Sequence, residues 1–183
     1  MVDGEKMLEL IIARQSDRRY DDKPVSDEKL NRIIEAGRMA PSACNAQPWK
    51  FVVITEKPLI SKLAEAAAAN VAGINTFVGQ VPALIVIVRE NRNLSSSIVG
   101  AIRKRDYSPI DIGICAENIC LQARAEGLGT CMIGWFDELM VRKILGIPRT
   151  KHVELIITIG YSLSEYRQKK RKPKEMVVSY NKY

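Results

Sequence analysis

The spacing of apolar residues divides the chain into helical and extended segments. Apolar side chains recur at helical spacing over residues 6–14, 27–39, 58–70, 108–126 and 138–145, and each run predicts a helix with one buried face. Shorter apolar runs at 51–55, 83–88, 130–133 and 152–159 predict strands. Residues 83–88 are apolar on both faces, which is typical of an interior strand. The order of these elements indicates a layered α/β or α+β domain.

Several helix ends can also be predicted. Ser26, Ser108 and Asp137 each precede a helical run and are suitable N-caps, and Gly146 is suited to ending the last helix. Residues 89–107 are polar and show little periodicity. A connection of this length is often a lid, a binding loop or a mobile segment.

Length and composition are those of an ordinary globular protein. The 183 residues, 46% of them hydrophobic and 27% charged, suit one domain over 1–183 whose last part, 166–183, forms an extended tail. No apolar run approaches the roughly 18 residues that a membrane span needs. Residues 1–6 lack a signal-peptide pattern, so we expect a cytoplasmic protein without a membrane partner.

The four cysteines show no Cys-x-x-Cys spacing. This argues against a zinc ribbon or an iron–sulfur cluster and favours free, buried thiols in a reducing compartment. The single histidine, His152, opens a strand and has no nearby cysteine, so we expect neither a metal site nor a histidine-based catalytic set.

Positive charge is concentrated near the C-terminus. The net charge is +7, and six of the eight residues from Arg167 to Lys174 are cations. Such a run can be a solvated tail, a nucleic-acid patch or an anchor for a phosphate group. Tyr161, Tyr166 and Tyr180 flank the run without interleaving it, so the stacking groups of a nucleic-acid site are missing and we expect no nucleic-acid partner.

The stretch 40–49 is the most distinctive part of the sequence. Pro41 and Pro48 bracket Ser42, Asn45 and Gln47, whose side chains donate and accept hydrogen bonds. A loop of this kind can hold a planar, polar ligand, or it can be a capped turn with solvated amides.

The chain has no Gly-x-Gly-x-x-Gly, Walker or Gly-x-Ser-x-Gly motif, so demanding chemistry is best assigned to an organic cofactor. Cationic segments at 14–18 and 169–171 suit its phosphate and the loop suits a ring edge, a combination that describes flavin mononucleotide (FMN).

Four stretches together resemble the FMN-dependent nitroreductases, small bacterial flavoproteins. They are the strings Arg-Gln-Ser-Asp-Arg-Arg-Tyr at 14–20, Ala-Pro-Ser-Ala-Cys-Asn-Ala-Gln-Pro-Trp at 40–49, Gly-Leu-Gly-Thr-Cys-Met-Ile-Gly at 127–134 and Lys-Lys-Arg-Lys-Pro at 169–173. They occur in the family's order and span nearly the whole chain. The resemblance implies an α+β fold with a central, mainly antiparallel sheet flanked by helices, in a homodimer whose extended C-terminal tail is swapped onto the partner.

The resemblance also implies which residues bind FMN, at two sites on the dimer interface. One chain would supply Arg14, Gln15, Ser16 and Arg18, with Lys169 and Arg171 near the phosphate and Ile133 and Gly134 near the ring. The other chain would supply Pro41, Ser42, Ala43, Asn45 and Gln47. No protein side chain is expected to act as a catalytic acid, base or nucleophile.

The activity implied by the resemblance is oxidoreduction. NAD(P)H would reduce the flavin, which would then reduce a nitroaromatic, a quinone or a similar electron-poor acceptor by a ping-pong mechanism. The alternatives are a reductive dehalogenase or flavin reductase on the same fold, or a flavin store or sensor with little turnover.

Overall fold

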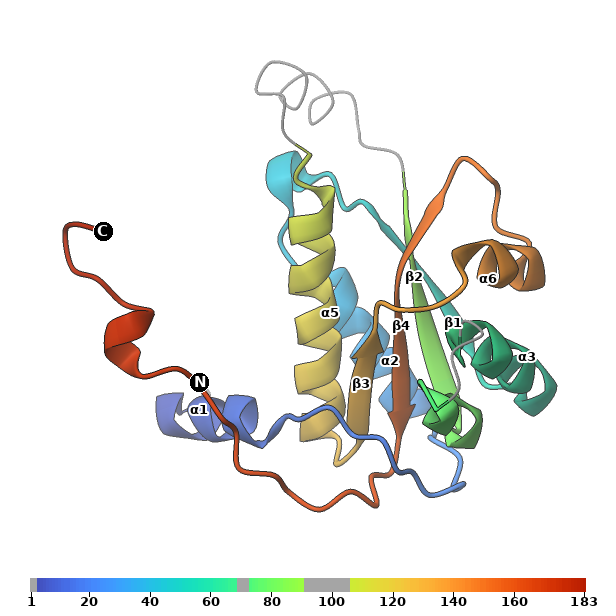
Figure 1. The fold of residues 1–183 in the computed structure, drawn as a ribbon, viewed down its shortest axis with the longest axis horizontal. Coiled ribbons are helices and arrows are strands. Elements are labelled where there is room, and N and C mark those ends of the chain that lie inside the picture. Colours follow the sequence, from blue (N-terminus) through green and yellow to red (C-terminus); the bar gives the residue numbers. More distant parts are fainter. Residues whose placement is uncertain (1–2, 69–72, 91–105) are drawn as a thin grey trace.

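The computed structural model describes residues 3–68, 73–90 and 106–183 and is built around an antiparallel sheet (Figure 1). Its strands are β1 (Trp49–Ile54), β2 (Ala83–Arg89), β3 (Gly129–Ile133) and β4 (His152–Gly160), in the spatial order β1-β2-β4-β3. All neighbouring strands are antiparallel. The predicted α+β class with a mainly antiparallel sheet is therefore confirmed, and the run 83–88 is an interior strand as predicted.

Helices cover both faces of the sheet. These are α2 (Asp27–Arg38) and α5 (Ser108–Ala125) on one face, and α3 (Lys57–Ala68) and α6 (Glu138–Leu145) on the other (Figure 1). Side chains alternate along a strand, so Ile85 and Ile87 pack toward α2 and α5 while Leu84 and Val86 pack toward α3 and α6. The interior strands thus contribute to two separate cores.

Three of the four predicted caps, Ser26, Asp137 and Gly146, occupy the expected positions, although the Ser26 side chain makes no capping hydrogen bond. The Asp137 side chain accepts a hydrogen bond from the Met140 backbone at 2.9 Å, and Gly146 ends α6 in the left-handed conformation at a φ of 66°. Ser108 is not the cap of α5, because that helix begins one residue earlier than expected, with Tyr107 as its N-cap. The Ser108 backbone N–H instead donates to Asp106 Oδ1 at 3.0 Å.

The two ends of the chain lie away from the sheet. The first helix, α1 (Gly4–Ala13), has no buried residue. After β4 the chain continues as an extended tail that passes α1 and contains one short turn, η3 (Lys174–Met176) (Figure 1). The extended tail matches the prediction, and its exchange with a partner subunit stays a prediction.

Three further predictions concerned membrane spans, the burial of the cysteines and the segment 89–107. None of the described helices is long and apolar enough to cross a membrane. Cys115, Cys120 and Cys131 are buried, but the expectation of a buried thiol is wrong for Cys44, which is exposed. Of the segment 89–107, residues 91–105 lie outside the described part of the chain.

Candidate functional site

Two of the predicted segments, the turn at 14–18 and the cationic tail, meet in one open pocket of about 480 Å³. We call it the first pocket. It is lined by Arg14, Gln15, Ser16, Arg18, Arg167, Gln168, Lys169, Lys170 and Arg171. All six of the predicted cofactor-binding residues from these two segments are in this list.

Asp17 fixes the turn to the edge of the sheet. Its side chain is 1% exposed, and Oδ1 accepts hydrogen bonds from Gln15 Nε2 and Ser162 Oγ, both at 2.8 Å. Its backbone N–H donates to the Thr130 carbonyl at 2.9 Å. Two of these partners, Ser162 and Thr130, are distant in sequence. Beside it, a Cβ on Gly129 would lie 2.5 Å from Asp17 Oδ2, so this approach needs glycine.

Gln15 joins the tail to the turn. Its Nε2 donates to the Glu165 carbonyl and its Oε1 accepts from the Arg167 backbone N–H, each at 3.0 Å. The Arg167 guanidinium donates to the Ser16 carbonyl at 2.6 Å, and the Lys169 amine donates to the Ile12 carbonyl. These bonds bring cations that are about 150 positions apart in sequence into one pocket.

The electrostatics of the first pocket favour a bound anion. Partial burial and then the positive charges of Arg14 and Arg171 lower the pKa of the Lys169 amine. Arg14 Nε is buried and has no hydrogen-bond partner among the described residues, although Glu117 Oε1 lies 3.2 Å away in poor geometry. Crowded cations suit a phosphate, which accepts several charge-assisted bonds at once.

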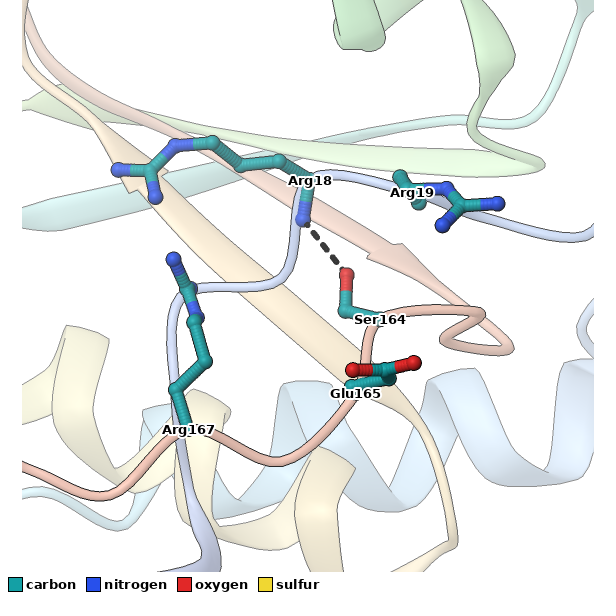
Figure 2. Close-up of a pocket in the computed structure, with 5 residues that line it drawn as sticks. All are labelled: Arg18, Arg19, Ser164, Glu165 and Arg167. Atoms are coloured by element: carbon teal, nitrogen blue, oxygen red, sulfur yellow. Dashed lines mark hydrogen bonds between the residues drawn. The ribbon is translucent and has the colours of Figure 1, made fainter.

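Arg18 extends the positive charge over β3. Figure 2 shows its side chain reaching across that strand. Burial raises the pKa of the Cys131 thiol on β3, and the charge of Arg18 partly offsets this rise. At the end of the strand Ile133 is buried and Gly134 is exposed. Arg18 therefore lines the first pocket and also places positive charge beside β3.

The loop Pro41–Gln47 forms a separate, strained site. Ser42 Oγ accepts from the Gln47 backbone N–H at 2.9 Å, and Gln47 Nε2 donates to Asn45 Oδ1 at 3.0 Å. The φ angles of Cys44, Asn45 and Gln47 are 53°, 50° and 46°, a conformation that is costly for residues other than glycine and is common at ligand-binding sites.

This loop does not join the first pocket within one chain. The loop contacts α5 where the Ala43 N–H donates to Asp111 Oδ1 at 3.1 Å, whereas Arg14 meets the same helix at Glu117. Six helical residues correspond to roughly 9 Å along the axis and to different faces of the helix. The prediction assigned Pro41, Ser42, Ala43, Asn45 and Gln47 to the partner chain, and that assignment stays a prediction.

Trp49 and His152 do not line the first pocket. Trp49 is a core residue that stacks on Phe51. His152 is exposed, with Nδ1 3.4 Å from Glu138 Oε1. Within the described ranges, no three His, Cys, Asp or Glu residues are grouped as a metal site.

The pocket residues missed from the sequence are Arg167, Gln168 and Lys170. The basic run contained Arg167 and Lys170, but position in a run does not tell which side chains face the turn.

Comparisons with known proteins now decide the family. The model of the nitroreductase family matches residues 11–161. The chain belongs to the nitroreductase family. A relative from Archaeoglobus fulgidus, provisionally named NADH dehydrogenase/NAD(P)H nitroreductase, is 33% identical and covers 88% of each chain. An oxygen-insensitive NADPH nitroreductase of Helicobacter acinonychis is 27% identical and covers 96% of this chain and 97% of its own.

Solved structures of the nitroreductase family have the same fold. An FMN-dependent nitroreductase from Clostridium difficile matches with a TM-score of 0.79 at 28% identity, over 96% of this chain and 99% of its own. The NADPH:FMN oxidoreductase of Vibrio harveyi, solved with NAD⁺, has a TM-score of 0.80 at 26% identity, over 97% of this chain and 77% of its own. The family resemblance seen in the sequence is confirmed.

Proposed function

We propose that this nitroreductase-family protein is a cytoplasmic, FMN-binding oxidoreductase that uses NAD(P)H to reduce nitroaromatics, quinones or similar electron-poor acceptors. The observation that carries the proposal is the first pocket, in which cations from the turn at 14–18 meet cations from the tail at 167–171. Relatives named for FMN and NAD(P)H agree with this chemistry. When bound, FMN supplies a ring that takes two electrons from a nicotinamide and gives them to an acceptor.

The residues of this chain would bind and orient the cofactor. Arg14, Lys169 and Arg171 are suited to its phosphate. Arg18 extends over β3 and would hold positive charge beside the ring, where it stabilises negative charge that develops during reduction. Ser16 and Gln15 lie between these cations and hold the turn against the tail. Ile133 and Gly134 would form the adjoining wall.

We further propose that the working unit is a homodimer. The apolar face of α1 supports this, because Met7, Leu8, Ile11 and Ile12 are each at least 40% exposed. An amphipathic helix with a solvated apolar face is unusual in a monomer. The partner's tail would cover this face, and the partner's loop at 41–47 would complete each cofactor site. An interface of this obligate kind buries more than roughly 2,000 Å².

Absorption and steady-state kinetics test the proposal together. The purified protein should be yellow, with a flavin band at about 450 nm. Double-reciprocal plots of rate against NAD(P)H concentration at several fixed acceptor concentrations should be parallel, because donor and acceptor would occupy one place in turn. His152→Gln should leave the rate unchanged, since the residue lies outside the pocket.

Other results would point elsewhere. Intersecting lines would mean that donor and acceptor bind at once, which contradicts a shared place. A yellow protein that oxidises neither NADH nor NADPH would favour flavin storage or sensing. A colourless protein that takes up no added FMN would overturn the cofactor assignment.

A further inference from the structure

A second pocket lies next to the first. It has a volume of about 370 Å³ and is lined by Arg18, Arg19, Ser164, Glu165 and Arg167 (Figure 2). Arg18 and Arg167 line both pockets, whereas Arg19 lines only the second and Lys169 and Arg171 only the first. The two pockets therefore share two arginines, and each also has cations of its own.

The second pocket carries surplus positive charge. Its lining has three guanidinium groups and one carboxylate. Arg18 and Arg19 form no salt bridge with any of the residues that the structure describes. Figure 2 shows the Arg18 and Arg167 guanidinium groups on one side of Glu165 and the Arg19 guanidinium on the other. Cations without a carboxylate partner around an open pocket suit an anionic ligand.

The backbone of the second pocket is held in place although its side chains are exposed. The Arg18 N–H donates to Ser164 Oγ at 3.3 Å, and the Arg19 carbonyl accepts from the Leu163 N–H at 2.9 Å. Gln15 bonds the backbone of Glu165 and of Arg167. The arginines therefore start from fixed positions, which lowers the entropic cost of binding a ligand between them.

We propose that the second pocket binds a phosphate group of the nicotinamide donor. This rests on the proposed function, in which the FMN phosphate takes the first pocket with Lys169 and Arg171. The remaining positive charge then needs another anion. Nitroaromatic and quinone acceptors carry no phosphate, whereas NADH carries a pyrophosphate and NADPH carries the same pyrophosphate and a 2′-phosphate.

Donors with different numbers of phosphates test the proposal. The experiment measures kcat/KM for three donors with one acceptor: NADPH, NADH and reduced 1-benzylnicotinamide, which has no phosphate. The proteins compared are the unmodified protein, Arg19→Ala and Lys174→Ala. Arg19→Ala should lower kcat/KM about tenfold for a phosphate-bearing donor and leave the benzyl donor unchanged. Lys174→Ala removes the same charge from an exposed tail residue outside both pockets and should change nothing.

The pattern of loss identifies the phosphate. A loss confined to NADPH assigns the 2′-phosphate to the pocket, and an equal loss for NADH and NADPH assigns the pyrophosphate. FMN affinity, measured by quenching of flavin fluorescence, should be the same in Arg19→Ala and the unmodified protein.

Direct binding separates this inference from the proposed function. Calorimetry on the FMN-loaded protein should show NADP⁺ or NAD⁺ binding that Arg19→Ala weakens about tenfold, even if turnover is absent. Wild-type affinity for both nucleotides in Arg19→Ala, or no binding to the unmodified protein, would overturn the inference. Loss of FMN binding in Arg19→Ala would overturn it too, because the cofactor phosphate would then occupy the second pocket.

Discussion

The interior strands and the two chain ends use apolar residues in opposite ways. Ile85 and Ile157, on β2 and β4, are fully buried. Leu8 in α1 is 57% exposed and Val177 in the tail is 64% exposed. The sheet closes its core within one chain, whereas the ends, which carry most of the cations of the first pocket, leave apolar surface to be covered. The region that folds by itself and the region that binds are therefore different parts of the molecule.

The largest change in stability is expected for a substitution in the buried core of the sheet. Ile157→Ala removes a fully buried side chain from an interior strand and should lower the free energy of unfolding by about 2–5 kcal/mol. The matched change Leu8→Ala on α1 should alter the stability of a single chain by less than about 0.5 kcal/mol. Urea unfolding of both variants at a protein concentration low enough for single chains to predominate measures the difference, and equal losses there would contradict the division between core and ends.

The next largest effect is expected on the affinity of the cationic tail for FMN. Arg171→Ala should weaken FMN binding roughly ten- to a hundredfold, because a charge-assisted bond to phosphate is lost. High salt should partly reproduce the loss in the unmodified protein. Flavin fluorescence quenching measures both.

Lys174→Ala is the control for Arg171→Ala, since it removes a cation of the same tail that does not line the pocket. Equal losses in the two variants would mean that the tail acts only through its net charge. Unchanged affinity in Arg171→Ala would contradict its assignment to the phosphate.

The same contrast explains what could be read from the sequence. Strand 83–88 and the cap at Asp137 were predictable because period, burial and capping are local properties. The start of α5 was predicted one residue too late, with Ser108 as its cap. Asp106 accepts a hydrogen bond from the Ser108 backbone N–H, and the sequence pattern does not show which of these neighbouring polar side chains bonds the backbone. Four cations of the first pocket, Arg14, Arg18, Lys169 and Arg171, were predictable from the family motifs.

Other features depend on contacts between distant residues. The bridging role of Gln15 and the burial of Asp17 arise from partners near Ser162–Arg167, about 145–152 positions away. The spacing of apolar residues along a short segment carries no information about such long-range contacts. The role of Arg167 was missed for the same reason: only the folded chain turns its guanidinium toward Ser16.

The exposed face of α1 provides a smaller effect that tests the proposed homodimer. Leu8→Ser should weaken subunit association at least about tenfold if this side chain is buried against a partner, since burying a leucine is worth about 1.5–3 kcal/mol. The stability of a single chain should hardly change. Lys6→Ser, an exposed polar position of the same helix, is the matched control. Sedimentation over a range of protein concentrations measures the equilibrium, and a monomer that retains full FMN would refute the dimeric site.

The smallest expected effect is a pH dependence of FMN binding at Lys169. Burial and neighbouring cations lower the pKa of this amine in the free protein. The protonated amine binds phosphate, so its contribution to affinity is present below that lowered pKa and is lost as the pH rises through it. The loss should be a few-fold and should begin at a lower pH than for an ordinary lysine, whose pKa is about 10.4.

Lys169→Arg separates this titration from that of the ligand. Arginine stays charged throughout the range, while the phosphate and the flavin titrate identically in both proteins. The ratio of the two FMN dissociation constants, measured from about pH 7 to about pH 10, should therefore report the Lys169 amine alone. A ratio that stays constant would mean that the amine does not contact the phosphate, and the affinity of the cationic end would then rest on its arginines.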